Sequence, residues 1–74
     1  MRFDRVSFDP AVMGGRACIR GLRITVALVV NLVANRMTIA GILREYPDLE
    51  PEDIEQALQY AARLADEELA PLAD

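Results

Sequence analysis

The chain has 74 residues, a net charge of −4 and a hydrophobic fraction of 53%, so it is too apolar for a disordered tail. A chain this short forms one domain at most, and folding buries only about 60% of the surface that the unfolded chain exposes, so we expect a partner to add stability. The single cysteine, Cys18, excludes an internal disulfide, and the absence of histidine argues against most hydrolytic and zinc chemistry.

No segment of the chain predicts membrane insertion. The longest apolar run, residues 24–30 with Thr25 inside it, is too short to span a bilayer. Arg2 and Arg5 are not followed by the apolar stretch of a signal peptide. We therefore expect a cytoplasmic protein without a membrane contact.

Charge is distributed unevenly along the chain. Residues 1–44 contain seven arginines and two acids, whereas residues 45–74 contain one arginine and ten acids. All eight cations are arginines, which suit bidentate contacts to phosphate or carboxylate groups, although a GC-rich genome produces the same bias. The pattern leaves open whether the first half binds an anionic ligand or pairs with acids of its own or a neighbouring chain.

The first 25 residues have strand rather than helix character. Gly14 and Gly15 predict a turn with positive φ, and further Gly and Pro residues separate short β-prone runs. These runs are residues 5–8, 17–19 and 22–25. Because such short strands do not form an independent sheet in water, we expect them to pack on helices or to pair with another chain.

A helical period begins after Thr25. The valines on one face of this first helix are Val26, Val29, Val30 and Val33. Asn35 is expected to take the left-handed conformation that ends the helix. Thr38 then caps a second helix, which runs from Ile39 to about Tyr46.

Two prolines predict where the second helix ends and the third begins. Pro47 stops the second helix, and Pro51 suits the first position of the third, which we expect over residues 51–65 or beyond. Its buried stripe is predicted to be Ile54, Ala57, Leu58, Ala61 and Ala65. Its solvent-facing side is predicted to be Glu52, Asp53, Glu55, Gln56, Gln59 and Arg63. The sequence thus predicts a single, mainly helical domain with an extended or β segment at 1–25, three helices within 26–65 and an acidic tail at 66–74.

Two parts of the sequence carry a resemblance to a known family. Residues 9–24 read DPAVMGGRACIRGLRI, and residues 42–49 and 53–58 read ILREYPDL and DIEQAL. Together they resemble the DUF433 family from about residue 6 to residue 62. The resemblance implies a homeodomain-like three-helix domain with a helix-turn-helix. It also implies a role as the antitoxin of a toxin–antitoxin pair, beside a PIN-like ribonuclease toxin.

A contact with operator DNA stays open at this point. Arginines contact phosphate oxygens in most protein–DNA complexes. The candidates here are Arg16, Arg20, Arg23, Arg36 and Arg44. The third helix is less suited to the major groove, because acids near its start would be repelled by phosphates. Only Gln56 and Gln59 on that helix suit adenine edges.

The sequence also predicts contacts with a second copy of the chain and with a toxin. The apolar surface of the first helix is wider than a small core needs, so we expect a homodimer through Val26, Val29, Val30 and Val33. An antitoxin of this kind can mimic RNA with its acids. The expected toxin contacts are Asp66, Glu67, Glu68, Leu69 and Leu72. The alternative function is a dimeric protein–protein interaction module without a DNA role. The sequence predicts neither an enzyme nor a bound cofactor or metal.

Overall fold

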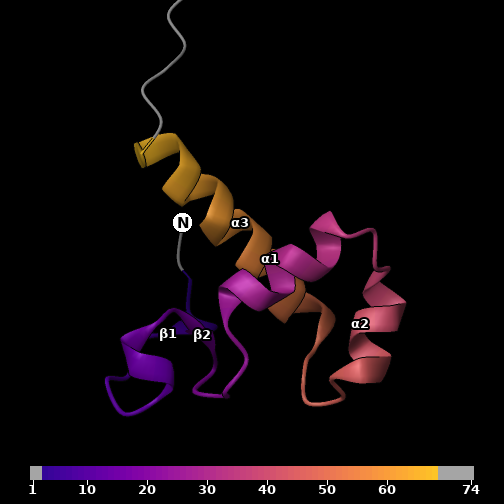
Figure 1. The fold of residues 1–74 in the computed structure, drawn as a ribbon, viewed down its shortest axis with the longest axis horizontal. Coiled ribbons are helices and arrows are strands. Elements are labelled where there is room, and N and C mark those ends of the chain that lie inside the picture. The colour runs from indigo at the N-terminus through magenta and orange to yellow at the C-terminus, as the bar shows by residue number, and fades with distance from the viewer. Residues whose placement is uncertain (1–2, 69–74) are drawn as a thin grey trace, which may run out of the picture.

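Helices dominate the fold, and a short two-stranded sheet precedes them, as predicted (Figure 1). The computed structural model describes residues 3–68, without the side chains of residues 67 and 68. The elements in chain order are β1 (Val6–Ser7), the 3₁₀ turn η1 (Met13–Gly15), β2 (Cys18–Ile19), α1 (Val26–Ala34), α2 (Ile39–Glu45) and α3 (Pro51–Glu68). No helix among the described residues is both long and apolar enough to cross a membrane.

The N-terminal segment reverses its direction twice. Strand β1 pairs antiparallel with β2, so that Val6 lies opposite Ile19, and a further bridge joins Cys18 to Thr25. The second reversal turns at Arg20 and Gly21, which have φ values of 46° and 73°. Glycine adopts this left-handed conformation freely, whereas an arginine needs other contacts to hold it there.

Threonine side chains cap the first two helices, and the cap at Thr38 was predicted. The Leu28 N–H donates to Thr25 Oγ1 at 3.0 Å, and the Gly41 N–H donates to Thr38 Oγ1 at the same distance. Each bond satisfies one of the backbone donors left free at a helix start. Both predicted helix starts are therefore confirmed.

The end of α1 differs from the prediction by one residue. Arg36, with φ of 68°, takes the left-handed conformation that the sequence had suggested for Asn35. The Arg36 N–H donates to the carbonyl of Val33, and the Met37 N–H donates to the carbonyl of Leu32. This is the paired bonding of a Schellman motif, which satisfies two carbonyls at the helix end and turns the chain toward α2.

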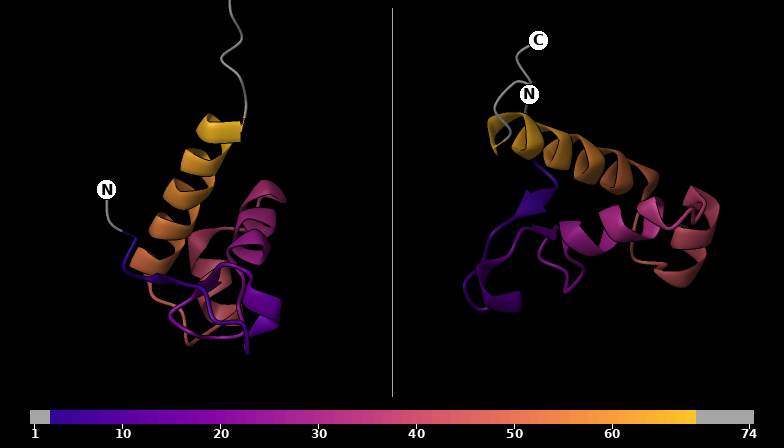
Figure 2. Two further views of the ribbon diagram at one scale, coloured as in Figure 1. Left: turned by 90° about the vertical axis from the view of Figure 1, so that its left-hand side faces the viewer. Right: turned by 45° about the horizontal axis from the view of Figure 1, so that its top comes forward.

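Helix α3 packs on α1 and α2 and closes a small apolar core (Figure 2). The buried apolar side chains of this core come from β2, from all three helices and from the loop before α3: Ile19, Val26, Val29, Ile42, Leu49, Ile54 and Ala57. The helix runs to Glu68, which agrees with the prediction that it extends to residue 65 or beyond, and no helix breaker follows Pro51 until Pro71. The predicted acidic tail at 66–74 thus begins inside α3.

Candidate functional site

A buried carboxylate, Asp53, joins the N-terminal segment to the start of α3. Its side chain is 0% exposed and receives bonds from two arginines. Arg5 Nη1 lies 2.9 Å from Asp53 Oδ1, and Arg20 Nη2 lies 2.9 Å from Asp53 Oδ2. Arg5 also contacts Glu50 at 2.7 Å. We call Arg5, Arg20, Glu50 and Asp53 the Asp53 cluster.

Backbone groups complete the Asp53 cluster. The Glu50 N–H donates to Asp53 Oδ2 at 2.7 Å, which is one half of a capping box at the start of α3. Arg20 Nη2 donates to the carbonyl of Asp48 at 2.6 Å, so its side chain spans the loop before α3. These contacts hold Arg20 in the left-handed turn conformation. The cluster therefore fixes the β2 turn, the loop and the helix start relative to one another.

Opposing effects act on the pKa of Asp53. Burial disfavours the charged form and raises the pKa, but the hydrogen bonds from Arg20, the Glu50 N–H and Arg5 favour that form. The bonds outweigh burial, so the pKa lies below its usual value of 3.8. Asp53 is consequently ionised at neutral pH, and its two arginines keep their positive charge.

The prediction that Asp53 faces solvent was wrong. Its carboxylate is buried because the N-terminal segment covers that side of α3, a long-range contact that helical spacing alone does not show. One signal was available in the sequence. Asp53 precedes Ala57 by four residues and so lies on the same face as the apolar stripe.

Part of the α3 face that was predicted to read bases is hydrogen-bonded to the N-terminal segment. Gln56 Oε1 accepts a hydrogen bond from the Arg5 N–H at 3.0 Å, and Gln56 Nε2 donates to Asp4 at 2.7 Å. Gln56 is half-buried, whereas Glu52, Glu55 and Gln59 are exposed. The exposed remainder of this face thus carries two acids and one amide.

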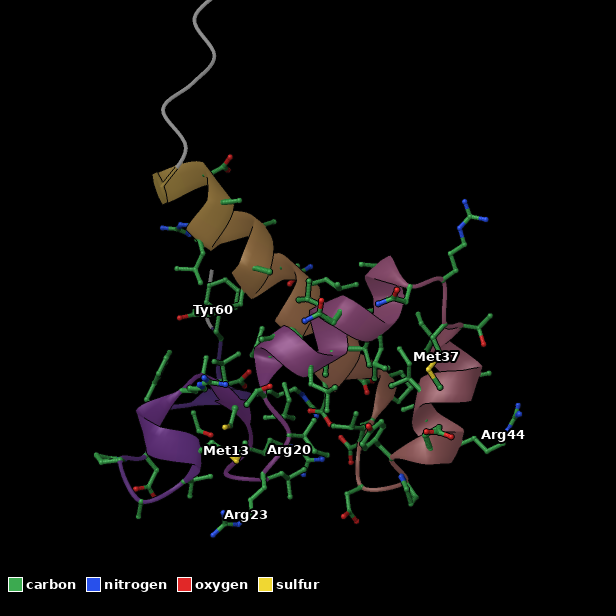
Figure 3. The ribbon with its side chains drawn as sticks, viewed as in Figure 1. Met13, Arg20, Arg23, Met37, Arg44 and Tyr60 are labelled. Atoms are coloured by element: carbon green, nitrogen blue, oxygen red, sulfur yellow. The ribbon has the colours of Figure 1, made fainter. Side chains whose placement is uncertain are left out.

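The predicted DNA-binding arginines do not form one patch. Arg20 is held in the Asp53 cluster, between the N-terminal segment and α3, while Arg23 and Arg44 lie at separate edges of the molecule (Figure 3). Within residues 3–68, four of the five make no side-chain hydrogen bond or ion pair. These are Arg16, Arg23, Arg36 and Arg44, all of which are exposed.

The predicted dimer valines divide into two pairs. Val26 and Val29 are 5% and 0% exposed in the core of the single chain, so they are not available to a second one. Val30 and Val33 are half-buried, and Val30 lines an open groove. A homodimer surface on α1 would therefore be narrower than the valine pattern suggests.

The groove lies between α1, α3 and the N-terminal segment and encloses about 640 Å³. Figure 2 shows the two helices diverging above that segment. The apolar walls of the groove include Phe8, Ala27, Val30, Ala61 and Leu64. Phe8 is 60% exposed and Leu64 is 39% exposed, which is unusual for side chains so large and apolar. The surface is therefore a candidate for a protein contact.

Aromatic contacts shape one wall of the groove. The ring of Tyr60 on α3 lies edge-on to Phe3, with a centroid distance of 5.4 Å, and 6.0 Å from the ring of Phe8. These contacts attach the N-terminal segment to the middle of α3, as the Asp53 cluster attaches it to the start. The N-terminal segment, which carries Phe8, is thus attached to α3 at two points, Asp53 and Tyr60.

Three of the five predicted toxin-binding positions, 66, 67 and 68, form the far end of α3. This end projects beyond the other helices (Figure 1), and Asp66 there is exposed. Glu67 and Glu68 belong to the helix, but their side chains lie outside the described set. Leu69 and Leu72 also lie outside the described residues. Among residues 3–68, no group of three or more His, Cys, Asp or Glu side chains is arranged to hold a metal ion.

Together these features define a three-helix domain that is closed by an N-terminal β segment and carries an open apolar groove. The chain belongs to the DUF433 family, whose model, described as "Protein of unknown function (DUF433)", matches residues 6–61. No curated protein and no solved structure shows significant similarity to it.

Proposed function

We propose that this protein is an antitoxin that neutralises a PIN-like ribonuclease toxin through protein contacts. The observation that carries the proposal is the contrast between the two ends of α3. The N-terminal segment covers the start of α3 through the Asp53 cluster and the hydrogen bond from Arg5 to Gln56. The C-terminal end of α3 projects from the body and carries acids. The family resemblance supplies the class of partner.

The physical reason for this assignment is charge mimicry. A ribonuclease surface that binds RNA phosphates is basic, so a helix end with several carboxylates can occupy it in place of RNA. Helix α3 places Asp66 in solvent, and the sequence adds two acids directly after it. Apolar residues at 69 and 72 then supply anchors of the kind that most protein contacts require.

Charge reversal at Asp66 tests this contact. In cells that express a PIN-like ribonuclease whose toxicity the native protein relieves, Asp66→Lys together with Leu69→Ser should abolish growth rescue at wild-type expression. The control is Glu55→Lys, which reverses the same charge at another exposed position of α3 and should rescue as the native protein does. Full rescue by the first variant contradicts a contact at this end of the helix.

A homeodomain-like reading of DNA is a separate part of the proposal. Because the acids on α3 would repel DNA phosphates, we assign any DNA contact to the exposed arginines. Arginines bind phosphates without reading the base sequence. Arg23→Ala with Arg44→Ala should therefore weaken binding to the upstream duplex across sequences and flatten its salt dependence in fluorescence anisotropy. Gln59→Ala should leave the affinity unchanged. A loss of sequence preference in the Gln59 variant would show that α3 does read bases.

A further inference from the structure

We propose that residues 3–5 form a latch on α3, which opens while the rest of the protein stays folded and so controls access to Gln56 and Tyr60. This conformational device is separate from the proposed toxin contact at Asp66 and does not depend on it. Three features support the latch: the groups that it covers, the partners that remain when it opens, and the point at which the chain pivots.

The closed latch covers one face of α3. The Arg5 N–H donates to Gln56 Oε1 at 3.0 Å, and Gln56 Nε2 donates to Asp4 Oδ1 at 2.7 Å, so the oxygen and the nitrogen of this amide are both engaged. One helical turn further on, the Phe3 ring meets Tyr60 edge-on at a centroid distance of 5.4 Å. Because Gln56 and Tyr60 are four residues apart, they share a face of the helix. The closed latch therefore occupies the polar and aromatic groups that this face would offer to a partner.

The buried carboxylate of Asp53 keeps its partners when the latch opens. Arg5 donates to Asp53 Oδ1 alone, whereas Arg20 donates to both carboxylate oxygens and the Glu50 N–H donates to Oδ2. The side chain of Glu50, which is the other partner of Arg5, is 55% exposed, so water can replace the lost ion pair. Opening thus avoids the penalty for a buried charge without a partner.

The chain has a defined pivot at Arg5. Its carbonyl accepts the Arg20 N–H at 2.9 Å, and the paired strand β1 begins at the next residue. Before the pivot the contacts are few, because residues 3–5 contribute no buried side chain to the core. After the pivot the chain is held by β-pairing and by Ile19 in the core. We therefore expect the latch to open far more often than the protein unfolds.

Hydrogen exchange of the full chain, measured by NMR, tests whether the latch opens separately. The reporter is the Arg5 N–H, and the core reference is the Ile19 N–H, which donates to the carbonyl of Ile24 at 2.9 Å. After correction for intrinsic rates, the Arg5 N–H should be protected, but its opening constant should exceed that of the Ile19 N–H by about 100-fold or more.

Two phenylalanine variants test whether the latch moves as a unit. Phe3→Ser should raise the opening constant at the Arg5 N–H by about tenfold, because the ring and the amide are released together. The matched control is Phe8→Ser. Phe8 contacts the same Tyr60 ring, at 6.0 Å, but lies after the pivot, so its loss should leave the Arg5 N–H unchanged. Asp4→Ala, at an exposed latch residue, serves as a second variant and should act like Phe3→Ser.

Urea unfolding tests whether the core folds without the latch. Arg5→Ala should lower the folding equilibrium constant by less than about tenfold, because Arg20 still neutralises Asp53, whereas Asp53→Asn should lower it by more than about 100-fold. Four results would overturn the proposal. They are an Arg5 N–H without protection, equal opening constants at Arg5 and Ile19, equal effects of the two phenylalanine variants, and an Arg5→Ala variant as unstable as Asp53→Asn. Because none of these measurements includes a toxin or DNA, the latch can fail while the proposed function stands, and the reverse also holds.

Discussion

Replacing Asp53 with asparagine is expected to lower the free energy of unfolding by about 3 kcal/mol, because it leaves two arginines facing an uncharged side chain at a fully buried position. The amide also presents N–H groups where the carboxylate accepted bonds only. The free energy of unfolding of a domain this small is only several kcal/mol, so this substitution should remove a large part of it. Urea unfolding followed by circular dichroism measures the loss.

The adjacent residue provides the control for Asp53. Glu52 lies in the same first turn of α3 but is exposed, so Glu52→Gln should change the free energy of unfolding by less than about 0.5 kcal/mol. Equal stability of the two variants would contradict the structural role of the Asp53 cluster.

The Asp53 cluster also predicts how stability depends on pH. Because the pKa of Asp53 is lower in the folded protein than in the unfolded chain, the carboxylate stabilises the fold fully above its unfolded value. This contribution is lost as the pH falls below about 4 and passes through the lower, folded pKa. The native urea midpoint should therefore fall in acid, and the midpoint of Asp53→Asn should fall less steeply over the same range.

The second large effect is expected at Ile19. This β2 residue is 0% exposed and packs in the core with residues of all three helices. Replacing it with alanine should cost about 3 kcal/mol, from lost burial and from the cavity left between the segment and the helices. The control is Ile39→Ala, the same change at an exposed site, which should alter stability by less than about 0.5 kcal/mol.

The Ile19 comparison asks whether the N-terminal segment is part of the folded unit. Equal urea midpoints for the two isoleucine variants would mean that the helices fold without the segment. In the structure, the segment contributes Ile19 to the core, two arginines to the Asp53 cluster and Phe3 to the contact with Tyr60. We therefore expect the segment and the helices to unfold together.

The two ends of α3 differ in how much of their surface is covered. Its start is fixed by Asp53 and covered by the N-terminal segment, which leaves little of it for a ligand. Its second half carries Leu64 on the groove side and Asp66 on the opposite side. The groove side and the Asp66 side of α3 are therefore separate surfaces, because successive positions of a helix point in different directions.

The local structure of the chain could be predicted from the sequence because its signals are local. Thr38 and Pro51 mark helix starts through their own side chains, and each lies where the sequence predicts. The valine spacing predicts a helix over the right residues, and the Gly14-Gly15 turn has the expected positive φ. The family resemblance, carried by short motifs, is confirmed over most of the chain.

The site depends on contacts between residues far apart in the sequence, and only the tertiary structure decides these. Nothing in the sequence distinguishes Arg20 and Asp53 from ordinary exposed charged residues, yet the β2 turn brings Arg20 Nη2 to 2.9 Å from the buried carboxylate of Asp53. Val29 and Val30 are adjacent and equally apolar, yet one lies in the core and the other lines the groove. A sequence period identifies the apolar face of a helix, but the neighbouring elements determine how much of that face they cover, and so which residues remain for a partner.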